Sequence, residues 1–125
     1  FKSEDFTKEL LNQNIDLIVL AGFLWLLPKH LIDAFPNKII NIHPSLLPKH
    51  GGKGMYGMHV HEAVVADKDK ESGISIHYVN ENLDEGAIIF QAKVEVKPTD
   101  TPEDVAHNVH ALEYEYFPKV IESLL

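Results

Sequence analysis

The sequence predicts an α/β fold in which an open, mostly parallel sheet is flanked by helices. The run at residues 16–21 is almost entirely apolar and the run at 38–42 is rich in isoleucine, which is typical of strands buried on both faces. A segment with helical spacing separates them, and the order strand, helix, strand favours a crossover between parallel strands. Two further strand patterns and a strongly marked helix follow, which indicates that all elements belong to one layered domain.

The N-terminal half alternates helical and extended segments. Ser3 can cap a helix whose apolar positions are Phe6, Leu10 and Leu11. After the strand at residues 16–21, Pro28 suits the first turn of a short helix. That helix would bury Leu31, Ile32 and Phe35 and end at Pro36, just before the second strand.

Past a glycine-rich loop at residues 51–57, the helical pattern returns at 59–66. Residues 72–80 then alternate between an isoleucine-bearing face and a face that carries Ser75 and His77. With the strand pattern at 86–96 they predict an antiparallel pair.

A helix is predicted to begin at Thr101, where the residues that follow are a proline and two acids. Its apolar face would carry Val105, Val109, Leu112 and Tyr116. Pro118 is expected to bend or break this helix, because proline removes a backbone donor and clashes with the preceding turn.

The composition fits one globular domain. The chain has 125 residues, 45% of them hydrophobic and 24% charged, with a formal net charge of −8 and no arginine. A surface that follows nucleic-acid phosphates needs clustered positive charge, so no nucleic-acid partner is expected. No apolar run approaches the roughly 20 residues of a membrane span, no secretion signal is visible, and there is no cysteine. The prediction is a cytoplasmic protein that does not bind membranes.

A candidate active site lies where the second strand ends. Asn41 and His43 are two residues apart and would share one face of that strand. A carboxamide beside an imidazole can stabilise a developing oxyanion and move a proton. Asp84, in the loop between the last two strands, could hold the histidine in its charged form. The alternative is structural: Asn41 stabilises the loop, and Asp84 belongs to a turn beside Gly86.

Other site types are weakly supported. His59 and His61 could suggest a metal, but residues two apart on a helix point to different faces, and no metal is expected. The glycine-rich loop lacks the spacing of a phosphate-binding loop. The apolar segment 22–27 follows a strand end, where open α/β sheets bind ligands, so it is either core or a wall for a flat heterocycle.

Three segments together resemble the folate-dependent formyltransferases. They are residues 21–23, the block Asn-Ile-His-Pro-Ser-Leu-Leu-Pro at 41–48, and Leu-Asp-Glu-Gly at 83–86 with Ile89 and Gln91. The resemblance runs from about residue 16 to residue 118 and is strongest to members that formylate glycinamide ribonucleotide in purine synthesis. It implies a Rossmann-like formyltransferase domain and a cis bond between Leu47 and Pro48.

The resemblance also implies roles for single residues. Asn41 would donate to the formyl oxygen, His43 would carry the proton, and Asp84 would hold His43. The co-substrate 10-formyltetrahydrofolate would contact Leu24, Trp25, Leu26, Leu27, Ile32 and Ile39, and the backbone from Asn80 through Glu81, Asn82 and Leu83. Glycinamide ribonucleotide would meet Pro44, His110 and Glu113. His110 and Trp25 depart from the residue types common in relatives.

The family begins with a strand and a Gly-Ser-rich loop that binds the substrate phosphate, and no segment here matches them. The expectation is one formyltransferase domain over residues 1–125 that lacks the N-terminal strands, that is, a truncated fragment. Alternatives are a related formyltransferase acting on methionyl-tRNA or a sugar nucleotide, a formyltetrahydrofolate hydrolase, or an inactive folate-binding fragment. The acidic, arginine-free composition argues against tRNA.

Overall fold

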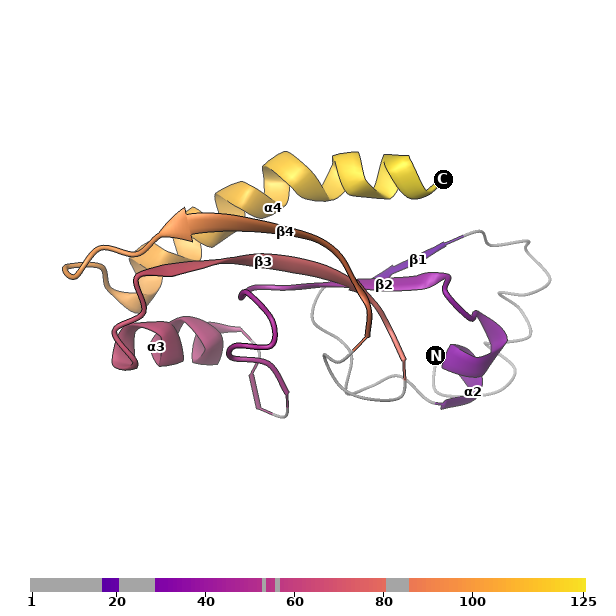
Figure 1. Cartoon of the computed structure of the whole chain (residues 1–125), viewed down its shortest axis with the longest axis horizontal. Coiled ribbons are helices and arrows are strands. Elements are labelled where there is room, and N and C mark those ends of the chain that lie inside the picture. Colours follow the sequence, from indigo (N-terminus) through magenta and orange to yellow (C-terminus); the bar gives the residue numbers. More distant parts are fainter. Residues whose placement is uncertain (1–16, 21–28, 53, 56, 81–85) are drawn as a thin grey trace.

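The computed structural model describes residues 17–20, 29–52, 54–55, 57–80 and 86–125. Within them, four strands form an open sheet in the order β1-β2-β3-β4, accompanied by three helices (Figure 1). The strands are β1 Ile18–Leu20, β2 Ile39–His43, β3 Glu71–Tyr78 and β4 Ile88–Glu95; the helices are α2 Lys29–Ala34, α3 Met58–Ala66 and α4 Pro102–Leu124. The predicted α/β fold with an open sheet and flanking helices is confirmed.

The described part of the sheet is mixed and differs from the mostly parallel sheet that the sequence predicted, because antiparallel pairs outnumber the parallel pair among these strands. β1 pairs with β2 in parallel, as the strand-helix-strand order predicts. β2 pairs with β3 and β3 with β4 in antiparallel, which confirms the predicted late pair. β2 is buried along its whole length, but the expected burial of β1 on both faces is wrong for Val19, which is 39% exposed. Among the described strands, β1 has a neighbour on the β2 side only.

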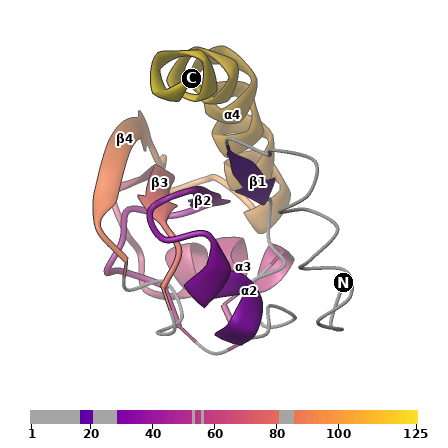
Figure 2. The ribbon, with the colours of Figure 1, turned by 90° about the vertical axis from the view of Figure 1, so that its right-hand side faces the viewer.

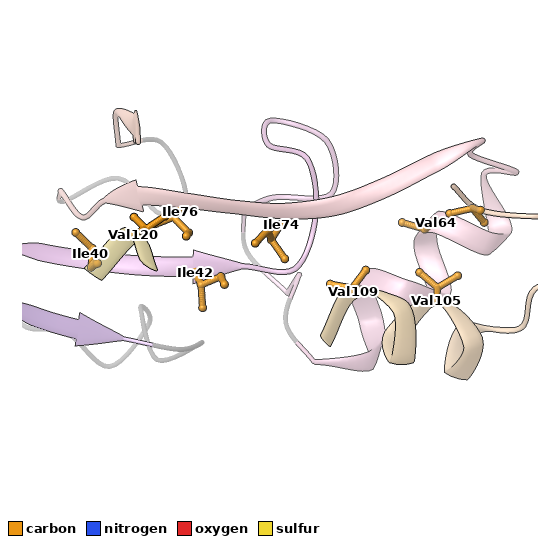
Figure 3. Packing of buried hydrophobic residues seen from close by; sticks show 9 residues of the cluster. Ile40, Ile42, Val64, Ile74, Ile76, Val105, Val109 and Val120 are labelled. Atoms are coloured by element: carbon orange, nitrogen blue, oxygen red, sulfur yellow. The ribbon is translucent and has the colours of Figure 1, made fainter. Parts of the chain in front are cut away.

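One face of the sheet carries the main core. Ile40 and Ile42 of β2 and Ile74 and Ile76 of β3 alternate with the residues of the opposite face, so all four side chains point the same way. They pack against helices α3 and α4 through Val64, Val105, Val109 and Val120 (Figure 3). Val64, Val105 and Val109, whose spacing predicted the apolar faces of the two helices, all lie in this cluster.

Helix α2 lies on the opposite side of the sheet from α4 (Figure 2). Leu31 and Phe35 pack there against Ile39 of β2, as expected for this short helix. Asn41 and His43 have the same parity along the strand as Ile39 and therefore share its face. The same alternation along β3 gives one face to Ser75 and His77, and all of residues 72–77 are buried.

Helix α4 begins as predicted and ends later than predicted. The Thr101 hydroxyl accepts from the Asp104 amide while the Asp104 carboxylate accepts from the Thr101 amide, a complete capping box. The sequence predicted a bend or a break at Pro118, and the break is wrong, because the helix continues to Leu124. Val120 is buried and Phe117, Ile121 and Leu124 pack on the main core, and this packing compensates for the missing backbone bond. No helix in the described ranges is long and apolar enough to cross a bilayer.

The loop after β2 is fastened to the centre of the sheet by the hydroxyl of Ser75. This oxygen accepts from the Leu47 amide at 2.9 Å and from Gln91 Nε2 at 2.9 Å, and it donates to the Ser45 carbonyl at 2.7 Å. Gln91 also donates to the Leu47 carbonyl at 3.1 Å. The Leu47–Pro48 bond is cis, which confirms the expectation from the resemblance. The loop therefore folds back over β3 and keeps a fixed position.

We expect Ser75→Ala to lower the free energy of unfolding by about 2–4 kcal/mol, because a buried amide and a buried carbonyl each lose their partner. Ser72 provides a matched control on the same strand, since its buried hydroxyl has no hydrogen-bond partner in the described structure. Ser72→Ala should leave stability nearly unchanged. Denaturant titration of both variants measures the difference, and equal losses would contradict the role given to Ser75.

Candidate active site

Two pairs of polar residues face each other across β2 and β3. In the antiparallel register, Asn41 lies opposite His77, and His43 lies opposite Ser75. All four side chains are buried, and Asn41 and His77 are each only 1% exposed. Polar groups buried to this degree are stable only when hydrogen bonds satisfy them, so their bonds define their chemical state.

The contact between Asn41 and His77 fixes the orientation of the amide. His77 Nδ1 lies 3.0 Å from the carbonyl oxygen of Tyr78, which can only accept, so Nδ1 carries the hydrogen. In the tautomer with hydrogen on Nδ1 alone, Nε2 is an acceptor, and it lies 3.2 Å from Asn41 Nδ2. Asn41 therefore donates to His77 through its nitrogen. A carboxamide held this way is a preorganised donor.

Glycine is required at position 86 to keep this arrangement. A Cβ on Gly86 would lie 1.6 Å from the Tyr78 carbonyl oxygen, the same oxygen that accepts from His77. The ladder between β3 and β4 also shifts register between Ile76 and His77, at the end where the polar pairs lie. Such irregularities redirect side chains and often occur beside active sites.

His43 is held by the backbone of its own loop. Its Nε2 lies 2.8 Å from the carbonyl oxygen of His50, so Nε2 donates and carries a hydrogen. The side chain is 4% exposed. The prediction that Asn41 and His43 share one face at the end of a buried strand is thus confirmed.

Helices α3 and α4 bring further titratable groups to this end of the sheet. Burial, followed by the charges of His110 and His43, lowers the pKa of His61. Burial raises the pKa of the Glu113 carboxyl, while the neighbouring His110 acts in the opposite direction. Carboxyl groups and imidazoles with shifted pKa values gather at functional sites more often than elsewhere.

The remaining predicted residues are placed as follows. Ile39 is fully buried and Ile32 partly buried in the cluster under α2, and their contact with the co-substrate stays a prediction. Pro44 is partly buried directly after β2, and Asn80 is exposed two residues after the end of β3. Outside the described residues lie Leu24, Trp25, Leu26, Leu27, Glu81, Asn82, Leu83 and Asp84, together with the helix expected after Ser3. The pairing of Asp84 with His43 stays a prediction.

One group of potential metal ligands is close together in the described part of the chain. Side-chain atoms of His50, Asp67 and Asp69 lie within 4.8 Å of one another. His50 Nε2 is 2.7 Å from Asp69 Oδ2, and Lys49 Nζ is 3.5 Å from Asp69 Oδ1. These groups therefore satisfy one another. His59 and His61 point differently, as expected, because His61 is buried and His59 is exposed.

Sequence reasoning missed two residues of this site. His77 is not among the predicted site residues, yet it orients Asn41. The available signal was its parity with Ser75 on a strand adjacent to β2. His61 was considered only as a metal ligand, and its Nδ1 is buried with no hydrogen-bond partner in the described structure.

Comparison with known proteins identifies one family. A family model described as "Formyl transferase" matches residues 2–121. The chain is 46% identical over 110 residues to the chloroplastic phosphoribosylglycinamide formyltransferase of Arabidopsis thaliana, covering 88% of this chain and 38% of the relative. It is 43% identical over 108 residues to the phosphoribosylglycinamide formyltransferase of Haemophilus influenzae, covering 86% and 49%.

Solved structures agree. The phosphoribosylglycinamide formyltransferase of Bacillus halodurans superimposes with a TM-score of 0.84 at 36% identity, covering 97% of this chain and 60% of that one. The chain thus spans 38% of the Arabidopsis relative and 60% of the Bacillus halodurans structure.

The lowered pKa of His61 predicts a specific pH dependence of stability. Below the ordinary histidine pKa of about 6.5, His61 binds a proton in the unfolded chain but stays neutral in the folded protein until the pH reaches its lowered pKa. The free energy of unfolding should therefore fall as the pH drops from 6.5 toward that lowered pKa. The slope that one proton can contribute is at most about 1.4 kcal/mol per pH unit. His61→Gln should reduce the slope between pH 6.5 and 5, as measured by urea titration at each pH. His59→Gln, a change at an exposed histidine on the same helix, should keep the full slope.

Proposed function

The chain belongs to the formyl transferase family, and from this membership we propose that the protein transfers a formyl group from 10-formyltetrahydrofolate to the amine of glycinamide ribonucleotide. The relatives with the same domain carry the name of this activity. The proposal concerns a protein with the full length of the relatives, because this chain spans only 38% of the Arabidopsis relative.

The observation that carries the proposal is the orientation of Asn41. His77 accepts one hydrogen of the Asn41 NH₂ group, so the amide nitrogen and not the amide oxygen makes this contact. The second hydrogen of the same nitrogen is the donor that we assign to the formyl oxygen. Because the protein fixes this donor before the reaction, the donor can stabilise charge that develops in the transition state without reorganising.

The proposed reaction passes through a tetrahedral intermediate. The acceptor amine attacks the formyl carbon, and the carbonyl oxygen becomes an oxyanion bound by Asn41 and by a cationic His43. The bond from this carbon to N10 of the folate then breaks. N10 gains a proton, and the new formamide nitrogen loses one, with His43 carrying the proton between them. Asp84 would stabilise the His43 imidazolium during these steps of the reaction.

The two substrates are proposed to approach from different sides. The folate would use the residues around Ile32 and Asn80, with the segments 24–27 and 81–83. The ribonucleotide would meet Pro44, His110 and Glu113. A carboxyl group whose pKa is raised by burial can hydrogen-bond a sugar hydroxyl or accept a proton from the substrate amine.

We propose that the reaction is acid–base catalysis, that it proceeds without a metal, and that its substrates are small molecules alone. A location in the cytoplasm stays a prediction from the sequence, since the Arabidopsis relative is a chloroplastic protein.

Asn41→Ala in the full chain should lower kcat by about 10²–10³, because one preorganised oxyanion donor is lost. Affinity for a folate analogue should stay nearly unchanged. Steady-state kinetics with both substrates, together with calorimetry of the folate analogue, measure the two effects. Ser72→Ala serves as a variant that should keep the full rate.

An unchanged kcat with a raised KM would mean that Asn41 only binds substrate and would contradict the mechanism. Formate release is measured in the same assay without the ribonucleotide. If water replaced the amine at the full rate, the protein would be a formyltetrahydrofolate hydrolase and the proposed acceptor would be wrong.

A further inference from the structure

We propose that His50 and Asp69 are positioning residues for His43. In this proposal, the contact between the His50 ring and the Asp69 carboxylate holds the His50 backbone carbonyl against Nε2–H of His43. This proposal rests on the proposed function, because the orientation of the His43 ring matters for catalysis only if His43 carries the proton.

The first step is the bond from His43 Nε2 to the His50 carbonyl oxygen, at 2.8 Å. An imidazole ring can turn about its side-chain bonds and can carry its hydrogen on either nitrogen. A carbonyl only accepts, so this one contact fixes both the ring orientation and the position of the hydrogen.

The second step is the unusual backbone of His50. Its φ is +53°, in the left-handed region that residues other than glycine seldom occupy. Such a conformation is unfavourable and persists only where surrounding contacts hold it. The direction of the His50 carbonyl therefore depends on whatever fixes the rest of the residue.

The third step is the contact that fixes it. His50 Nε2 donates to Asp69 Oδ2 at 2.7 Å, and the side chains are only 11% and 10% exposed. Lys49 adds an ammonium group 3.5 Å from the other carboxylate oxygen. A hydrogen bond to a carboxylate is stronger than one between neutral groups, and partial burial protects it from water.

Asp69 itself is held by the end of helix α3. Its amide bonds to the Val64 carbonyl at 3.1 Å and the Lys68 amide bonds to the Val65 carbonyl at 3.1 Å. Lys68 has a φ of +55° between these bonds, so the three residues after α3 form a Schellman motif. The anchor for His50 is thus part of the helix end, and the link runs from α3 through Asp69 and His50 to His43.

The side chains of His50, Asp67 and Asp69 could also be considered as metal ligands, but their contacts fit a positioning role better. A metal would require His50 and Asp69 to give up a direct 2.7 Å hydrogen bond and to displace Lys49. Asp67, the third candidate ligand, is 3.8 Å from His50 Nε2 and 63% exposed. Asp67 therefore contributes little to holding the ring.

Asp67 and Asp69 provide a matched pair for the test. In the full chain, Asp69→Ala should lower kcat roughly 10- to 100-fold with KM for both substrates nearly unchanged, because a misoriented catalytic group affects the transition state most. Asp67→Ala removes the same charge two residues away and should keep the wild-type rate. His50→Asn tolerates the left-handed backbone but its shorter side chain places no ring beside Asp69, so it should lose a similar factor. The variant that combines Asp69→Ala with His50→Asn should be no slower than either single variant, because both substitutions remove the same contact.

A second measurement does not depend on turnover. Nitrogen-15 NMR of the imidazole rings, with the His43 signals identified by their loss in His43→Gln, should show hydrogen on Nε2 in the wild type. Asp69→Ala should give a mixture of tautomers at His43, whereas Asp67→Ala should not.

If Asp69→Ala keeps both the kcat and the His43 spectrum of the wild type, the proposal is wrong. If the wild type fails to formylate the ribonucleotide but its His43 spectrum responds to Asp69→Ala alone, the proposed function is wrong and the positioning contact is supported. Should Asp69→Ala not fold, His50→Asn supplies the same two measurements.

Discussion

The position of the loop after β2 is the constraint on which the candidate site depends, and a single buried hydroxyl supplies much of it. Ser75 lies in the middle of β3 and satisfies a donor and an acceptor of the loop backbone, with Gln91 of β4 as a third partner. These hydrogen bonds fix the position of the loop relative to the sheet. His50, at the end of the same loop, reaches His43 because of this fixed position.

Backbone carbonyls determine the chemical state of both site histidines. His43 donates to the carbonyl of His50 through Nε2, whereas His77 donates to the carbonyl of Tyr78 through Nδ1. The two rings consequently carry their hydrogens on different nitrogens. Because His77 offers an acceptor to Asn41, the amide must present its nitrogen. The fold thus assigns proton positions at the site through main-chain geometry.

The sequence predicted what depends on local pattern and missed what depends on pairing across the sheet. The burial of β2, the extent of α3 and the capping box at Thr101 follow from spacing and cap chemistry, and all were confirmed. The break at Pro118 was wrong, since packing around Val120 outweighs a local penalty. Asn41 and His43 were found because they are neighbours in sequence. The contacts of His77 with Asn41 and of His50 with Asp69 join residues 36 and 19 positions apart, and no local pattern marks them.

Helix α4 has a consequence for how acceptor specificity could change. It continues unbroken from its capping box to Leu124 and carries His110 and Glu113 close to Val109, which is fully buried against the sheet. Volume changes at core positions would therefore move the two polar side chains together, without touching either. In the proposed function these two residues meet the acceptor, so laboratory evolution of new acceptors should search the core under α4 as well as the residues that meet the ligand.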